Sequence, residues 1–342
     1  MEDNFFDLGG HSLLAMRLVG RIRAELGVPV QVGTVMSAPT VAGVAARIGT
    51  DARRDALRVV LPLRERGSRA PLFCFHPASG FSWQYTGLLR NLDPERPVYG
   101  VQSPGLSGQL PAVADVAGLC ELYLAEIRAV QPEGPYHFAG YSFGGTVAHT
   151  LAAMLQERGE EVAFLALLDA YPPEREDWSY LDSPDWRERL EREESGFLLS
   201  VAGLDGGTGG AVSRAEAVAA IRDSQGLLAG FDEELLHAVV DTNVHCVRLL
   251  SRSRTRRFRG PVLFFTAARS TPTADAPGLV WPAHIDGALT EHVLDCGHDD
   301  MMSAGALDEI GPLLDAALRA VPGGGQHRPP TAIDPASASQ LR

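Results

Sequence analysis

Cysteine, positive charge and long apolar runs are all scarce in this 342-residue chain. The four cysteines, Cys74, Cys120, Cys246 and Cys296, are far apart and lack the spacing of metal ligands. Their pattern therefore disfavours a metal site built from cysteines. It predicts buried free thiols in a reducing cytoplasm.

Acidic residues outnumber basic ones by 43 to 30, and the net charge is −13. Such a charge disfavours nucleic acid or an anionic membrane surface as a partner. Residues 1–5 contain neither the basic nor the apolar segment of a secretory signal. No apolar run is long enough to span a bilayer. We therefore expect a cytoplasmic protein with neither a nucleic-acid nor a membrane partner.

Short apolar runs alternate with helical patterns through most of the chain. With 45% hydrophobic residues, the chain can build a substantial core in one large domain or two. The apolar runs predict strands at 72–75, 98–101, 136–139, 162–168, 262–265 and 292–294. The helical patterns lie near 113–130, 144–158, 232–250 and 306–320. This alternation predicts an α/β fold, with a mostly parallel sheet and helices on both faces.

Three stretches depart from the alternation. Residues 171–250 contain no convincing strand and are charged and helical in part, so this insertion is a candidate lid. A helical subdomain without a gating role is the alternative. Residues 49–70, rich in Arg, Asp and Gly, predict a linker rather than a core element. Residues 321–342 are aperiodic and rich in small residues and proline, which predicts a disordered tail.

Ser142 lies in Gly140-Tyr141-Ser142-Phe143-Gly144, between a predicted strand and a predicted helix. A serine nucleophile on a sharp strand-to-helix turn needs glycine two positions away on either side, because a larger residue would clash. The following helix N-terminus favours developing negative charge. The alternative is a Gly-rich turn with a buried serine, but the strand–turn–helix context favours a nucleophile.

A serine hydroxyl needs a base, and with this elbow the partners follow in the order serine, acid, histidine. His298 comes just after the last predicted strand and is the histidine that fits best. Asp169 ends the apolar run 162–168, at the carboxyl end of a central strand, where α/β folds place functional groups. Asp275, after the next strand, is the rival acid, and we weight Asp169 over it.

The oxyanion of an acyl-transfer intermediate needs two backbone N–H groups. Phe143, the residue after the nucleophile, is expected to supply one of them. The loop after the first predicted strand should supply the other, and Ala78 is our choice. His76 in the same loop precedes the serine in the chain, so we interpret it as a loop-structuring residue rather than the base.

A second serine, Ser12, begins an amphipathic helix predicted over residues 12–26, whose apolar stripe is Leu14, Leu18, Ile22 and Leu26. It follows Gly9-Gly10-His11, which leaves its hydroxyl accessible. The free N–H groups of the helix N-terminus suit a phosphate. A simple N-cap serine is the alternative. A short helix is predicted after Thr40, over residues 41–48.

Residues 2–48 resemble the C-terminal part of a peptidyl carrier domain of nonribosomal peptide synthetases, through Asp3-Asn4-Phe5-Phe6-Asp7-Leu8-Gly9-Gly10-His11-Ser12 and Ala38-Pro39-Thr40-Val41-Ala42. Residues 71–320 resemble the terminal thioesterase domain of these assembly lines, of the α/β-hydrolase family, through Phe75-His76-Pro77-Ala78, the Ser142 motif, Leu168-Asp169 and Gly297-His298. The implied organisation is a carrier domain (1–48) truncated at its N-terminus, a linker (49–70), a thioesterase domain (71–320) with a lid (171–250), and a tail.

This resemblance implies that Ser12 carries 4′-phosphopantetheine, that Asp169 is the acid, and that Ala78 and Phe143 form the oxyanion hole. The implied partners are upstream synthetase modules and a phosphopantetheinyl transferase. The predicted function is a chain-terminating thioesterase that releases a peptidyl or acyl chain through an acyl-Ser142 intermediate, by hydrolysis or cyclisation. An editing thioesterase, a general esterase or lipase, and a non-enzymatic carrier module are the alternatives.

Overall fold

The computed structural model of the chain describes residues 3–5, 8, 10, 12–28, 30, 34–35, 38–48, 56–202, 204, 212–224, 228, 231–270 and 280–321. Asp275, residues 49–55 of the predicted linker and residues 322–342 of the predicted tail lie outside this set. Within it, each helix is too short or too polar to cross a membrane. The four cysteines are buried and free, as predicted.

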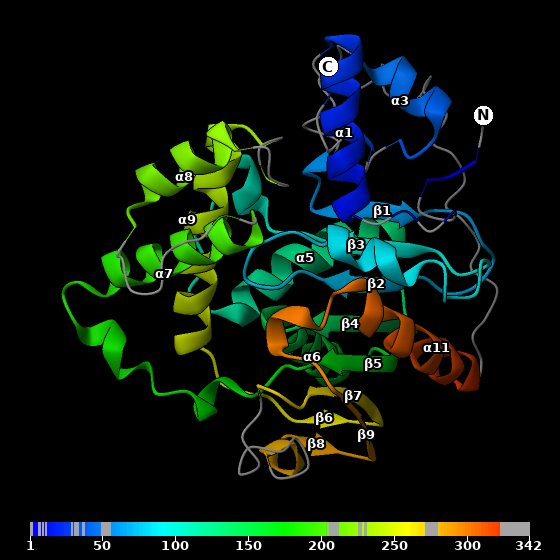
Figure 1. Cartoon of the computed structure of the whole chain (residues 1–342). Helices are drawn as coiled ribbons and strands as arrows, with labels where there is room; N and C mark the ends of the chain where they lie inside the picture. The colour runs from blue at the N-terminus through cyan, green and yellow to red at the C-terminus, as the bar shows by residue number, and fades with distance from the viewer. Residues whose placement is uncertain are drawn as a thin grey trace, which may run out of the picture.

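A seven-stranded sheet forms the centre of the molecule, in the order β1-β3-β2-β4-β5-β7-β9 (Figure 1). Only β1 is antiparallel to its neighbour. The strands are β1 (Val60–Arg64), β2 (Leu72–Phe75), β3 (Val98–Val101), β4 (Tyr136–Tyr141), β5 (Val162–Leu168), β7 (Val262–Ala267) and β9 (Leu289–Leu294). The predicted fold class, a mostly parallel sheet with helices, is confirmed.

Side chains that alternate along the central strands pack into two cores, one on each face of the sheet. Phe73 and Phe75 of β2 belong to the core that includes α5 (Val116–Val130) and α6 (Phe143–Glu157). Leu72 and Cys74 point to the other core, which includes η1 (Trp83–Leu88) and α11 (Ala304–Ala320). Because β2 is buried on both faces, it appears in the sequence as a continuous apolar run.

The prediction that residues 49–70 form only a linker was wrong, because β1 within this stretch is an edge strand of the sheet. Leu61 and Leu63 are buried in the core. Arg64 is buried too, because its guanidinium donates hydrogen bonds to the carbonyls of Leu89, Asp93 and Arg96 at 2.6–3.1 Å. The Arg64 guanidinium, whose charge suggested a linker, therefore has hydrogen-bond acceptors inside the fold. A second small sheet, β6 (Phe258–Arg259) with β8 (Ile285–Asp286), was also not predicted.

The described part of residues 171–250 contains helices and no strand, as predicted. The helices are η3 (Pro173–Arg175), η4 (Trp178–Asp182), α7 (Trp186–Val201), α8 (Arg214–Asp223) and α9 (Glu233–Ser251). Figure 1 shows α7, α8 and α9 as a group on one side of the sheet. The α7 helix packs against both α8 and α9, and α9 packs against η2 (Pro104–Ser107). A gating role for this group stays a prediction.

Two N-terminal helices, α1 (Ser12–Leu26) and α3 (Val41–Arg47), lie where the sequence predicted them. The expected apolar stripe is wrong at its ends, because Leu14 and Leu26 are exposed. Ala15 and Val19 of α1 are completely buried. They belong to the same core as η1, and α1 contacts η1 directly. The face of α1 that packs is therefore set by this tertiary contact rather than by the leucine spacing.

Candidate active site

The turn from β4 to α6 holds Ser142 in a strained backbone conformation, with φ 56° and ψ −126°. A Cβ atom on Gly140 would lie 2.1 Å from the Gly144 carbonyl oxygen. A Cβ atom on Gly144 would lie 2.1 Å from the carbonyl oxygen of Phe75, in the neighbouring strand. Both positions therefore exclude any larger residue, which is the steric demand of a nucleophile on a strand-to-helix turn.

Three predicted site residues from distant parts of the chain meet at this turn. The Nε2 atom of His298 lies 3.0 Å from Ser142 Oγ, and its Nδ1 atom lies 2.6 Å from Asp169 Oδ2. The Asp169 side chain is 3% exposed, whereas that of His298 is 35% exposed. The carboxylate can only accept, so Nδ1 carries the proton and Nε2 is left to accept from the serine hydroxyl. This is the arrangement of a serine, base and acid triad.

Backbone and side-chain donors hold Asp169 at the end of β5. Its backbone has a positive φ of 44°, and its N–H donates to the Phe265 carbonyl at 2.8 Å. The Oδ1 atom accepts from the Ala267 N–H at 3.0 Å and from the Tyr171 hydroxyl at 3.1 Å. These bonds leave Oδ2 directed at His298. The rival acid, Asp275, lies outside the described residues.

His298 is fixed through its main chain on both sides. Its N–H donates to Ser270 Oγ at 2.7 Å, and its carbonyl accepts from the Tyr141 hydroxyl at 2.7 Å. The rings of Tyr141 and His298 lie 5.0 Å apart. The supporting roles of Tyr141, Ser270 and Tyr171 were not predicted from the sequence. Tyr141 occupies a variable position of the elbow motif, so no sequence signal showed where its hydroxyl would bind.

The two predicted oxyanion donors flank Ser142. Phe143 is the first residue of α6, so its N–H lies where an α-helix has no internal partner. Ala78 lies in the loop after β2, and it lines a cavity together with Ser142. In this loop the Gly80 N–H donates to the Pro77 carbonyl at 2.9 Å. That these two N–H groups form an oxyanion hole stays a prediction.

His76 is buried beneath this loop. Its Nδ1 atom lies 2.6 Å from the Pro77 carbonyl oxygen and its Nε2 atom 2.6 Å from the Tyr123 hydroxyl. Burial lowers the pKa of His76 to about 4. The ring is therefore neutral, with Nδ1 donating to the loop carbonyl and Nε2 accepting from the tyrosine. It lies 5.5 Å from the Phe143 ring, so its contacts hold the loop and the start of α6 together.

Tyr85 joins the strands that lead to these two loops. Its buried hydroxyl donates to the Phe75 carbonyl at 2.7 Å and accepts from the Tyr141 N–H at 2.8 Å. The last backbone pair of β2 and β4 is Phe75 with Gly140, so the hydroxyl bridges the strands directly after this pair. It therefore sets the spacing between the loop that carries Ala78 and the turn that carries Ser142.

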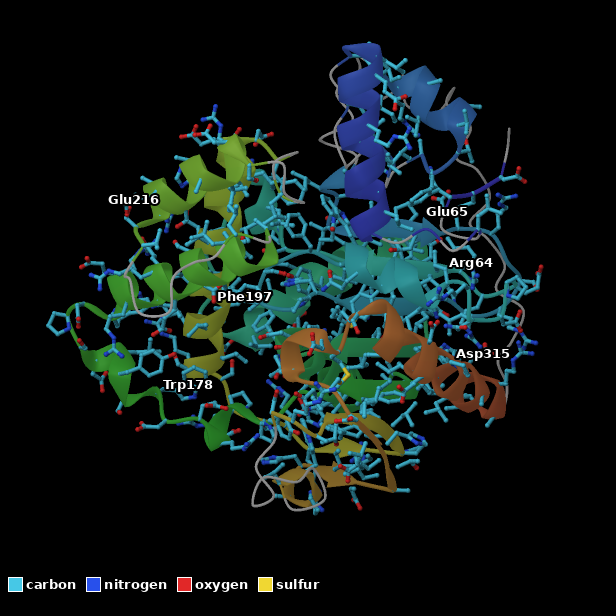
Figure 2. All side chains as sticks on the ribbon, in the orientation of Figure 1. Arg64, Glu65, Trp178, Phe197, Glu216 and Asp315 are labelled. Atoms are coloured by element: carbon cyan, nitrogen blue, oxygen red, sulfur yellow. The ribbon has the colours of Figure 1, made fainter. Side chains whose placement is uncertain are left out.

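Ser142 and His298 line two cavities. The first, of about 380 Å³, extends beneath α7 and α9. Its wall is largely apolar and includes Phe81, Trp83, Phe231, Val239 and Met302, together with Phe197, which α7 contributes (Figure 2). The second, of about 300 Å³, is more polar and is lined by Thr146, Asp169 and residues of η3 and η4 that include Trp178. A substrate bound at Ser142 can therefore extend in two directions.

Ser12, the predicted attachment serine, lies in the N-terminal region and is the first residue of α1. The first N–H groups of an α-helix have no internal partner and can bind a phosphate. A Cβ atom on Gly10 would lie 2.4 Å from the Phe5 ring and carbonyl, so the chain just before this helix is closely packed. A serine at the start of a 15-residue helix fits the attachment of a phosphate-linked group. No set of side chains suited to a metal ion occurs in the described part of the chain.

Comparisons with known proteins agree with this geometry. Residues 70–317 match the family model for the thioesterase domain, and residues 1–48 match that for the phosphopantetheine attachment site. A dimodular nonribosomal peptide synthase of Bacillus subtilis (strain 168) is 39% identical over 326 residues, which are 93% of this chain and 13% of that protein. Enterobactin synthase component F of Escherichia coli (strain K12) is 38% identical over 324 residues, covering 93% of this chain and 23% of that protein.

Solved structures give the same result. A four-domain nonribosomal peptide synthetase, holo-AB3403, matches with 25% identity and a TM-score of 0.65, covering 92% of this chain and 24% of that chain. The NocB thioesterase domain shares the fold, with 21% identity and a TM-score of 0.56 over 76% of this chain and 100% of that chain. The chain thus spans a small part of its multidomain relatives, and it belongs to the thioesterase-domain family, with a phosphopantetheine attachment region at its N-terminus.

Proposed function

We propose that this thioesterase terminates nonribosomal peptide synthesis, releasing a peptidyl or acyl chain from a carrier-bound thioester through an ester on Ser142. The observation that carries the proposal is the line of hydrogen bonds from Ser142 through His298 to Asp169, at 3.0 and 2.6 Å, beside a 380 Å³ cavity. The attachment region on the same chain supports a carrier-bound substrate.

In the first half-reaction, Ser142 Oγ attacks the carbonyl carbon of the thioester while its proton passes to His298 Nε2. Asp169 holds the ring with Nε2 facing the serine and stabilises the imidazolium. The tetrahedral intermediate then collapses, the carbon–sulfur bond breaks, and the proton on Nε2 goes to the departing thiolate. A thiol has a lower pKa than an alcohol, so this departure needs little acid assistance.

The N–H groups of Phe143 and Ala78 stabilise the oxyanion of this intermediate. The start of α6 adds the positive end of its helix dipole at the same point. In the second half-reaction, water or an amine or hydroxyl of the peptidyl chain gives its proton to His298 and attacks the ester carbon. Ser142 then leaves and regains its proton, and the product is a free acid or a ring.

We assign the largely apolar cavity to the acyl chain, because its wall of aromatic and aliphatic side chains can exclude water from the ester. We assign the more polar cavity beside Thr146 and Trp178 to the arm that carries the thioester sulfur. The two assignments place the reacting carbonyl between the cavities, where Ser142 and His298 lie.

We further propose Ser12 as the residue that bears 4′-phosphopantetheine. When attached, this group supplies the thiol that holds an acyl chain as a thioester. Its attachment requires a phosphopantetheinyl transferase as a partner, and upstream synthetase modules would deliver the chain. The buried free cysteines support a reducing compartment, which we expect to be the cytoplasm.

The test is the intact-protein mass during incubation with a broad-specificity phosphopantetheinyl transferase and an acyl-coenzyme A. We expect the full acyl-phosphopantetheine mass gain to persist in Ser142→Ala, whereas the unmutated protein should lose the acyl part and keep the phosphopantetheine part. Ser12→Ala should show no lasting gain. Clearance of the acyl group in Ser142→Ala would contradict the mechanism. Hydrolysis of matched long-chain oxygen esters as fast as thioesters would instead indicate a general esterase.

A further inference from the structure

Asn243 on α9 is a polar side chain that faces the apolar cavity without a partner. The residue is 9% exposed and lines the cavity together with Ser142 and His298. Its side-chain amide makes no hydrogen bond to any described residue. Because this amide belongs to an otherwise largely apolar wall, it is available to hydrogen-bond a polar group of a ligand inside the cavity.

Glu194 on α7 lines the same cavity and is half-buried. Its carboxyl group forms no ion pair or hydrogen bond with a described residue. The two charged groups that act on it most strongly, Glu193 and Asp299, are both acidic. The described residues that line the cavity include no arginine, and the chain contains no lysine. No arginine or lysine of the described cavity wall therefore neutralises negative charge there.

Other carboxylates of α7 show that arginines are available in this region. Glu191 pairs with Arg187 at 2.8 Å and with Arg214 at 2.9 Å, and Glu188 pairs with Arg192. These pairs lie on the outer part of the helix group, where they are partly exposed. Glu194 differs from them because its carboxyl lies beside an apolar wall and lacks a cation.

We propose that Glu194 and Asn243 select a cationic acyl chain, binding an ammonium or guanidinium group of the peptidyl substrate inside the cavity that leads to Ser142. This inference rests on the proposed function, since it assigns the cavity to the acyl chain. The cation supplies the charge partner that Glu194 lacks, and the Asn243 carbonyl oxygen accepts one of its N–H groups. Charge-assisted hydrogen bonds of this kind are stronger than neutral ones.

The test compares tripeptidyl N-acetylcysteamine thioesters that differ only in lysine or norleucine, with the change placed at each of the three positions in turn. We expect kcat/KM to favour lysine at one position by about 10- to 100-fold, the range of a hydrogen bond to a charged group. Glu194→Gln should bring this ratio near one. Glu193→Gln, an exposed neighbour on the same helix, is the matched control and should retain the preference.

Asn243→Leu should reduce the lysine-to-norleucine ratio of kcat/KM several-fold, because it removes one polar contact to the cation and replaces it with an apolar side chain of similar size. Thermal unfolding of each variant separates a folding defect from altered selection. We also expect the lysine preference to depend on pH, and this can be measured on the unmutated protein without any substitution.

Burial, together with the nearby carboxylates of Glu193 and Asp299, raises the pKa of Glu194 to about 7. The other titratable groups that bear on this site are His298 and Tyr141 in the cavity and Cys246 on α9. Burial raises the pKa of Tyr141, and burial together with Glu194 raises that of Cys246. Below pH 7 the Glu194 carboxyl is neutral, and above it the carboxylate binds cations. The lysine side chain of the substrate, with a pKa near 10.4, stays protonated throughout.

The ratio of kcat/KM for lysine over norleucine should therefore rise up to about tenfold between pH 6 and pH 8, since kcat/KM follows the free enzyme. His298 acts on both substrates as the base, so its contribution cancels in the ratio. A ratio near one at all three positions, or one that Glu194→Gln and pH leave unchanged, would overturn the proposal while turnover through Ser142 upheld the proposed function. Failure to cleave either thioester would instead count against the proposed function.

Discussion

Removal of the Tyr85 hydroxyl would test whether the spacing of β2 and β4 controls catalysis. Tyr85→Phe leaves the Phe75 carbonyl and the Tyr141 N–H without the partners that they have at 2.7 and 2.8 Å. Tyr85 is completely buried, so bulk water does not replace the hydroxyl. An unsatisfied buried group costs about 1–3 kcal/mol, so the two together should lower the free energy of unfolding by about 2–6 kcal/mol.

The same substitution should slow the reaction. The strands that Tyr85 bridges lead to Ala78 and to Ser142, and a displacement of ~1 Å between reacting groups can cost about 100-fold in rate. We expect kcat to fall about tenfold with little change in KM, because the cavity wall is intact. The measurements are urea unfolding followed by circular dichroism and steady-state hydrolysis of an N-acetylcysteamine thioester.

Tyr99→Phe is the matched control, because Tyr99 is a buried tyrosine of the neighbouring strand β3 whose hydroxyl has no hydrogen bond to a described residue. Its loss should change the free energy of unfolding by less than about 0.5 kcal/mol. A Tyr85→Phe protein that matched this control in both stability and kcat would refute the argument that the hydroxyl sets the spacing of the two loops.

Two further substitutions, each paired with a control variant, test the triad and the second cavity. Asp169→Asn places an amide donor opposite His298 Nδ1 and so favours the tautomer with a proton on Nε2; we expect kcat to fall about 10³- to 10⁴-fold, and a loss below tenfold would contradict the assignment. Tyr171→Phe removes only one donor to Asp169, at 3.1 Å, and should cost less than tenfold in the same thioester assay. Trp178→Ala should raise KM for an acyl-coenzyme A several-fold but leave KM for the methyl ester of the same acyl chain unchanged. Tyr180 lies outside the described lining of the cavity, so Tyr180→Ala should alter neither KM. Equal changes for both substrates in Trp178→Ala would refute the assignment of this cavity to the arm.

The central strands and the elbow were predictable because their local patterns carry their structural constraints. Strands such as β2 and β5 are buried on both faces, which makes them continuous apolar runs. The turn at Ser142 requires glycine at two fixed positions, where a Cβ atom would meet backbone at 2.1 Å. Asp169 and His298 were predictable because each of them comes shortly after the end of a predicted strand.

The missed features depend on contacts between distant residues. Tyr85 and Tyr141 are 56 residues apart, and Tyr141 and His298 are 157 apart, so no local pattern indicates their hydrogen bonds. The strand β1 escaped prediction because Arg64 has its donors satisfied by carbonyls from a later loop. Likewise, helical periodicity on α7 could not show that Glu194 faces a cavity whereas Glu191 faces arginines.

The most direct test of the central claim is a rapid-quench mass measurement of the acyl-enzyme. In a Ser12→Ala background, only the active site can hold an acyl group as an ester after mixing with a peptidyl N-acetylcysteamine thioester. The account predicts a transient mass gain that maps to the peptide containing Ser142 and is absent when Ser142→Ala is added. Product release at an unchanged rate in the double variant, or an acyl group mapped to another residue, would contradict it.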